Sequence, residues 1–280
     1  MAGINVYLMN RSPRSGGYRS PWAVKKVAQR FSGKRSDISQ RLLSEAQILK
    51  DLYHPNIVGY RAFTKSVDGS LCLAMERAEH SLMDLIEDRL DRKLGPFEPS
   101  KIERVGVDVA SALEYLHIEK LLMHGDVKSG NVLVFGQFEK AKLCDFGVSL
   151  ALDAAAGRAK EGAGYVGTEA WSAPEVLAVD SATAVGSQAD MFSYGLTIWE
   201  MLSLCLPHAD KLDASDGDSD VDEDSLEEAY QEALGSRPPL PELAVAVGTD
   251  YSKAVVVFIA CTEADPLDRP TATQTLEMWN

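Results

Sequence analysis

Residues 124–131 of this chain read His124-Gly125-Asp126-Val127-Lys128-Ser129-Gly130-Asn131, and Asp145-Phe146-Gly147 begins fourteen residues after Asn131. Each of these polar residue types is common, so a single one carries little information. The complete set, in this order and at this spacing, is specific. It decides the fold class and guides the interpretation of the remaining sequence.

The two stretches resemble the catalytic loop H-x-D-x-K-x-x-N and the metal-binding D-F-G of eukaryotic protein kinases. The resemblance implies that Asp126 accepts a hydrogen bond from the incoming hydroxyl group and that Lys128 contacts the transferred phosphoryl group. Asn131 is the third expected catalytic residue, and with Asp145 it is expected to hold Mg²⁺ against the phosphates of ATP. ATP and Mg²⁺ are therefore the expected cofactors.

A nucleotide site is also expected near the N-terminus. Trp22-Ala23-Val24-Lys25 resembles the strand motif V-A-I-K, whose lysine contacts the α- and β-phosphates. Glu45, twenty residues after Lys25, is its expected partner, because a buried lysine needs a carboxylate to remain charged. Core packing alone would also explain the apolar residues nearby. The resemblance implies an adenine pocket made by Val6 and Ala23 on the ring faces, Met75 at the back, and backbone groups from Glu76 to Ala78.

Motifs further along the chain indicate a platform for a protein substrate. Ala173-Pro174-Glu175 resembles the kinase A-P-E, and its glutamate is expected to pair with Arg269. Thr168 is expected to bond the catalytic Asp and Lys, and Asp190 to anchor the backbone of the catalytic loop. Lys128 favours transfer to serine or threonine over tyrosine.

Gly125 stands where most kinases have an arginine that binds a phosphorylated activation loop through bidentate bonds. The loop itself contains small residues over Ala154–Gly157. We therefore expect loop phosphorylation to control activity only weakly.

The apolar pattern places strands first and helices afterwards. Strands are expected at 6–9, 22–25, 57–63 and 71–75, helices at 39–52, 81–89 and 99–119, and a hairpin at 133–135 and 141–143. This order predicts an α+β, bilobal protein kinase fold forming one kinase domain. A small antiparallel-sheet N-lobe is expected over 1–76 and a helical C-lobe over 77–280.

The chain has 280 residues, of which 45% are hydrophobic and 25% charged, as in an ordinary soluble globular protein. Its longest fully apolar run, Ala254–Cys261, is too short to cross a bilayer, so no membrane association is expected. The cysteines are scattered singly, which indicates a reducing compartment. We expect the protein in the cytoplasm, the nucleus or both.

The net charge is −14, and residues 210–228 hold ten acidic residues against one lysine. One interpretation is a solvated insert kept open by self-repulsion. The other is a docking surface for a basic partner. Binding to nucleic acid is not expected, because the chain has no basic stripe to neutralise phosphates.

Several less common strings resemble the PDZ-binding kinase family, also called the lymphokine-activated killer T-cell-originated protein kinase family. They are Asn5–Met9, Ser20–Lys26, His54–Phe63, Gly69–Glu76 and Ala233–Pro239. The resemblance implies a serine/threonine kinase, with dual specificity as an option, related to MAP kinase kinases. It also implies a link to mitosis and stress-activated MAP kinase signalling, with MAP kinases or basic proteins as substrates.

Two features depart from that family. Only Gly3 represents its glycine-rich first strand, so we expect a truncated strand and an incomplete phosphate cradle. The family's C-terminal PDZ ligand is not matched by Glu277–Asn280, so PDZ binding is not expected. The incomplete loop leaves a catalytically weak kinase-fold scaffold as the alternative, whereas the complete polar set favours an enzyme. A small-molecule kinase is disfavoured by the A-P-E and Gly167-Thr168 motifs.

Overall fold

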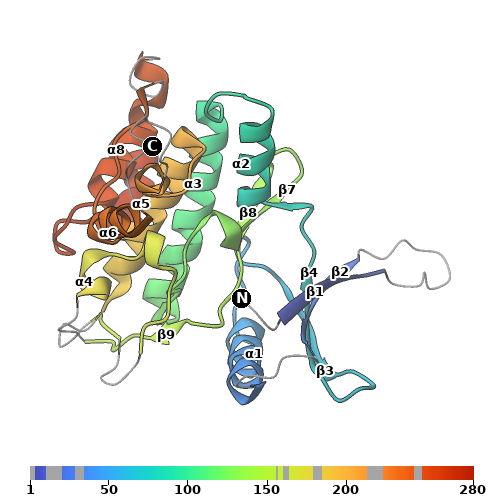
Figure 1. Ribbon diagram of the computed structural model, residues 1–280. Helices are drawn as coiled ribbons and strands as arrows, with labels where there is room; N and C mark the ends of the chain where they lie inside the picture. The colour runs from blue at the N-terminus through green and yellow to red at the C-terminus, as the bar shows by residue number, and fades with distance from the viewer. Residues whose placement is uncertain are drawn as a thin grey trace.

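The computed structural model describes residues 4–10, 21–28, 35–155, 157–159, 164–178, 185–212, 223–242 and 248–280. These residues form an N-terminal part built on an antiparallel sheet and a larger helical C-terminal part (Figure 1). The predicted α+β fold class is therefore confirmed. Gly3 and residues 213–222 of the acidic insert lie outside the described residues.

The N-terminal sheet has the strand order β1-β2-β4-β3, and every neighbouring pair is antiparallel. Its strands are β1 (Ile4–Met9), β2 (Trp22–Val27), β3 (Tyr60–Lys65) and β4 (Leu71–Glu76). Val6 lies opposite Lys25, and Ala23 lies opposite Met75. Directly opposed residues, and residues two apart on one strand, point to the same face of a sheet. These four side chains therefore share one face.

Helix α1 (Arg35–Lys50) packs against this sheet through Leu42, Ala46 and Leu49, which are buried at helical spacing. The helix begins before the predicted start at residue 39 and ends before residue 52.

The predicted strand 57–63 begins instead at Tyr60. Ile57 forms an isolated parallel bridge with Leu143, and the Val58 amide donates to the Leu143 carbonyl at 2.9 Å. The first residues of the predicted strand therefore tie the N-terminal part to the C-terminal hairpin and do not enter the sheet.

The C-terminal part begins with β5 (His80–Ser81) and α2 (Leu82–Asp91) and continues through α3 (Pro99–Glu114). A π-helical turn over Tyr115–Glu119 extends α3 to the end of the predicted long helix. The remaining elements up to the conserved-length hairpin and beyond are β6 (Leu122–Met123), η2 (Ser129–Asn131), β7 (Val132–Phe135), β8 (Lys140–Leu143), β9 (Leu150–Ala151), η3 (Glu169–Trp171), α4 (Pro174–Leu177), α5 (Ser187–Ser203), η4 (Ala209–Lys211), α6 (Glu223–Ala233), η6 (Gly248–Tyr251), α8 (Ser252–Cys261) and α9 (Ala272–Trp279).

Helix α5 is the centre of the helical part, because it is buried on all sides over Ala189–Leu202. The Trp279 indole of α9 donates to the Tyr194 hydroxyl of α5 at 2.7 Å. A Cβ atom on Gly106 of α3 would lie 2.4 Å from the Trp279 ring, so this position requires glycine. The C-terminal tryptophan thus locks three helices together.

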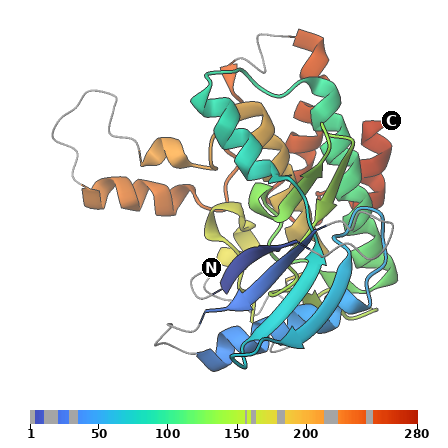
Figure 2. The same ribbon diagram turned by 90° about the vertical axis from the view of Figure 1, so that its right-hand side faces the viewer.

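Within the described residues, no helix has both the length and the hydropathy needed to span a bilayer. Figure 2 shows α6 and the preceding turn η4 projecting from the body of the helical part.

Candidate active site

Three side chains from separate elements meet on the sheet face that carries Lys25. Lys25 Nζ lies 2.7 Å from Glu45 Oε1 of α1 and 3.0 Å from Asp145 Oδ1, which follows β8. Lys25 and Glu45 are both buried. The sequence spacing thus correctly anticipated that these three groups come together.

The electrostatics of this group keep Lys25 charged. Burial alone would lower the pKa of Lys25, but the carboxylates of Asp145 and Glu45 outweigh it and raise the pKa. Burial raises the pKa of Glu45, and the Lys25 ammonium opposes that rise. A fixed ammonium beside acidic oxygen ligands is suited to a triphosphate with a divalent cation.

The backbone around Asp145 directs this carboxylate toward Lys25. Asp145 has φ of +67°, in the left-handed region that side chains rarely occupy. The next residue, Phe146, is fully buried, and its ring meets the His124 ring edge-on at 5.0 Å. Burial of Phe146 therefore holds the strained turn in place.

The catalytic-loop side chains form a second cluster around Asp126. Thr168 Oγ1 donates to Asp126 Oδ1 at 2.6 Å, and Lys128 Nζ donates to the same threonine oxygen at 2.5 Å. Lys128 Nζ also lies 3.0 Å from Asp126 Oδ2. Asn131 Nδ2 donates to the Asp126 carbonyl at 2.7 Å and to its carboxylate at 2.8 Å. The predicted residues therefore share one hydrogen-bonded network.

The donor set fits Mg²⁺. The Asn131 amide nitrogen is engaged with Asp126, which leaves the Asn131 amide oxygen, with the Asp145 carboxylate, as hard oxygen ligands. Among the described residues no group of three or more His, Cys, Asp or Glu is arranged as a metal cage. Two protein ligands agree with the habit of Mg²⁺, which takes its other ligands from phosphates and water.

Asp190 anchors the catalytic loop, as the sequence predicted. Its carboxylate accepts from the backbone amides of His124 and Gly125, both at 2.8 Å, and lies 2.8 Å from His117 Nε2. Burial would raise the pKa of Asp190, but the hydrogen bond from His117 and the neighbouring charges lower it overall. Asp190 is therefore an anionic clamp on the loop.

Gly125 is required by the backbone as well as marking the absent arginine. Its φ is +81°, and a Cβ atom would lie 2.9 Å from the Val148 carbonyl oxygen. A larger residue here would strain the catalytic loop.

The expected adenine residues are placed unequally. Ala23 is half-buried and Met75 is buried, whereas Val6 is 65% exposed on the edge strand. The Glu76 side chain turns toward Lys142 Nζ, at 2.7 Å, and its amide donates to the Gly59 carbonyl at 2.8 Å. The Glu76 amide is therefore already engaged. Ala78, which follows β4, is half-buried and takes part in none of the turn and loop backbone hydrogen bonds between described residues.

The predicted structural ion pair is present. Arg269 Nη1 and Nη2 donate to the two carboxylate oxygens of Glu175 at 2.7 and 2.8 Å. Arg269 is 2% exposed and also donates to the carbonyls of Glu263, Gln188 and Ala264.

Sequence reasoning missed Glu200, which lies on the buried helix α5. Its carboxylate accepts from the Ser129 hydroxyl at 2.5 Å, the Ser129 amide at 3.3 Å and the Trp171 indole at 2.8 Å. Glu200 thus links the catalytic loop to the segment after Thr168. Burial raises its pKa to about 7, although these hydrogen bonds act in the opposite direction. The available signal was an acidic residue within the apolar run of α5.

Comparisons with known proteins agree with this geometry. A family profile described as "Protein kinase domain" matches residues 14–279. Human lymphokine-activated killer T-cell-originated protein kinase is 48% identical over 98% of this chain and 85% of its own length. The *Xenopus laevis* mitogen-activated protein kinase kinase kinase 13-A is 33% identical over 67% of this chain and 17% of its own length. The *Drosophila melanogaster* serine/threonine-protein kinase Tao is 28% identical over 91% of this chain and 21% of its own length.

Proposed function

This chain belongs to the protein kinase family, and from that premise we propose that it is an ATP- and Mg²⁺-dependent protein serine/threonine kinase. It would transfer the γ-phosphate of ATP to a hydroxyl group of a protein substrate. The observation that carries the proposal is the pairing of two polar groups of residues. One is Lys25 with Glu45 and Asp145, and the other is Asp126 with Lys128 and Asn131.

Each group has a separate chemical task. ATP with Mg²⁺ supplies the activated phosphoryl group when bound. Lys25 would hold the α- and β-phosphates, because Glu45 and Asp145 fix its ammonium in one position. Asn131 and Asp145 would supply oxygen ligands to the metal.

The second group would act on the acceptor. Asp126 would accept the proton of the attacking hydroxyl, and Lys128 would neutralise charge on the transferred group. Thr168 holds both side chains at hydrogen-bond distance, so it is a positioning residue.

The finer assignment rests on resemblance. The 48% identity to a human protein kinase over nearly the whole chain favours the same class of reaction. Relatives named as MAP kinase kinase kinases, and one named as a dual specificity kinase, support a place in MAP kinase signalling with MAP kinases or basic proteins as substrates. Action in mitosis or stress signalling, in the cytoplasm or nucleus, belongs to the same proposal.

The test is phosphate transfer from γ-labelled ATP to three peptides that differ only in carrying serine, threonine or tyrosine as the acceptor. We expect incorporation into the serine and threonine peptides, and its loss when Mg²⁺ is chelated. Nucleotide binding is followed separately by thermal unfolding, where ligand at about 100 times its dissociation constant adds roughly 2.7 kcal/mol. A chain that neither binds ATP nor labels any peptide would instead be a kinase-fold scaffold.

A further inference from the structure

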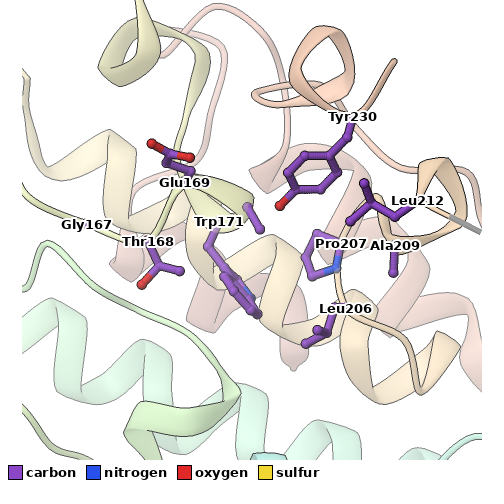
Figure 3. Close-up of a pocket in the computed structure, with 10 residues that line it drawn as sticks. Gly167, Thr168, Glu169, Trp171, Leu206, Pro207, Ala209, Leu212 and Tyr230 are labelled. Atoms are coloured by element: carbon purple, nitrogen blue, oxygen red, sulfur yellow. The ribbon is translucent and has the colours of Figure 1, made fainter. Parts of the chain in front are cut away.

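A cavity of about 440 Å³ lies between the Gly167–Trp171 segment, the Leu206–Leu212 segment and α6. We call it the α6 pocket. Figure 3 shows the Tyr230 ring entering it from α6, with Glu169 and Trp171 on one side and Leu206 and Pro207 on the other. Most of the side chains around the space are apolar, and they are Trp171, Leu206, Pro207, Leu212 and Tyr230.

The α6 pocket begins beside the acceptor site. Thr168 lines the pocket, and its hydroxyl donates to Asp126 at 2.6 Å. An extended peptide advances about 3.3 Å per residue. A substrate whose hydroxyl lies at Asp126 would therefore place a residue near its acceptor at the mouth of the pocket.

The pocket wall is unusually exposed for apolar side chains. Leu206 is 52% exposed and Leu212 is 47% exposed, and both line the same space. Exposed apolar side chains gathered around a cavity mark a surface that a partner covers.

The rim of the pocket is acidic. Burial is the main cause of the raised pKa of Tyr230, and the next causes are the negative charges of Glu169 and Glu227. Both carboxylates therefore lie within electrostatic reach of the Tyr230 hydroxyl. Within the described part of the chain, neither forms an ion pair with a basic side chain. Helix α6 carries five acidic residues and no basic one, and these are Glu223, Asp224, Glu227, Glu228 and Glu232.

We propose that the α6 pocket binds a segment of the protein substrate that carries a large apolar residue close to the acceptor and Lys or Arg beside it. The apolar side chain fills the space against Trp171 and Tyr230, and the basic side chain pairs with Glu169 and Glu227. An acidic segment or a nucleic acid would be repelled by this rim. This inference rests on the proposed function and adds the class of sequence that the enzyme selects.

The experiment measures binding of labelled peptides to the full chain by fluorescence anisotropy. The acceptor serine is replaced by alanine, so binding is measured without transfer. Four peptides combine Leu or Ala at the apolar position with Arg or Gln beside it. We expect the Leu-to-Ala change to weaken binding roughly 10-fold, from the lost apolar burial. The Arg-to-Gln change should weaken it roughly 3- to 10-fold, as for two solvent-exposed ion pairs.

Matched charge variants test the rim. Glu169→Gln with Glu227→Gln removes the two carboxylates next to Tyr230. Glu228→Gln with Glu232→Gln removes the same net charge from the opposite side of α6, because residues two apart on a helix face different directions. The first pair should abolish the preference for the Arg peptide, and the second should preserve it. Equal losses in both pairs would overturn the assigned rim.

A variant of the ring tests the pocket itself. Tyr230→Ala should remove most of the preference for the Leu peptide, whereas Tyr230→Phe should keep it. Thermal unfolding checks that each variant is folded. If all four peptides bind equally well to the wild-type chain, the inference fails even when the chain transfers phosphate. Selective binding without transfer to the matching serine peptides would count against the proposed function alone and would support the pocket.

Discussion

Glu200→Gln is expected to change how the stability of this protein depends on pH. In the folded chain the Glu200 carboxyl is fully buried and faces the Ser129 hydroxyl and amide and the Trp171 indole. Its pKa is raised from the ordinary 4.5 to about 7 because burial penalises the charged form. Between these two values the folded state binds the proton more tightly than the unfolded state.

The sign follows from this difference. Where the folded state holds more protons, the free energy of unfolding falls as pH rises, by about 1.4 kcal/mol per pH unit. The loss begins above the unfolded pKa of 4.5 and levels off above the folded pKa of about 7. Between pH 5.5 and 7.5 it amounts to roughly 2 kcal/mol for this one group. Glutamine has a similar shape and no charge, so the variant lacks this loss.

The assay is urea unfolding of the wild type and of Glu200→Gln at pH 5.5 and 7.5. Other titrating groups, such as Asp190 and Glu45, are present in both proteins and cancel in the comparison. The variant should gain roughly 2 kcal/mol relative to the wild type between the two pH values. A difference in stability that stays the same at both pH values would refute the assignment of a raised pKa to Glu200. As a control for the hydrogen bonds, Glu200→Ala should be destabilised at both pH values, because three buried donors lose their acceptor.

Three further substitutions and one treatment test other parts of the account. Lys25→Met should abolish phosphate transfer and lower stability by roughly 3 kcal/mol, because it leaves buried carboxylates unpaired; unchanged urea unfolding would argue against that ion group. Gly125→Ala should cost about 1–3 kcal/mol from its left-handed backbone, and an unchanged midpoint would contradict the strain. Arg269→Lys should cost roughly 3 kcal/mol by breaking the bidentate pair with Glu175, whereas full stability would make that pair dispensable. Phosphatase treatment should leave the rate of peptide phosphorylation nearly intact, because the Lys25–Glu45 pair forms without a phosphate and Gly125 offers no clamp; a large loss would reverse this expectation.

Much of the catalytic cluster could be predicted because its signals are local. Asp126, Lys128 and Asn131 lie within one short loop, where residue spacing nearly fixes the geometry. Lys25 and Glu45 are separated by twenty residues, yet a strand followed by a helix brings them face to face. The sequence pattern carries this information because the elements between them are regular.

Other features depend on contacts between distant segments. The start of β3 was misplaced because Ile57 pairs with Leu143, and no local pattern reveals that partner. Glu200 resembles an ordinary helix residue until folding places Ser129 and Trp171 against it. The exposure of Val6 also follows from its place on the edge strand of the sheet, which hydrophobicity alone does not predict.

The α6 pocket illustrates the same limit for binding sites. Trp171, Leu206 and Tyr230 come from separate segments, and each has an apolar side chain that core packing would explain equally well in the sequence. Only the folded chain shows that they enclose a shared space next to Thr168. Charge was the part of this surface that composition could reveal, since the acidic excess of residues 210–228 is visible directly.

The central claim is that Asp126 acts on the acceptor hydroxyl while a separate group of side chains holds the nucleotide. The most direct measurement is the rate of phosphate transfer by Asp126→Asn, made alongside its affinity for ATP with Mg²⁺. The account predicts affinity close to that of the wild type and a rate lower by roughly 10²–10⁴, the usual contribution of a positioned acid or base. Equal rates in the two proteins would contradict it.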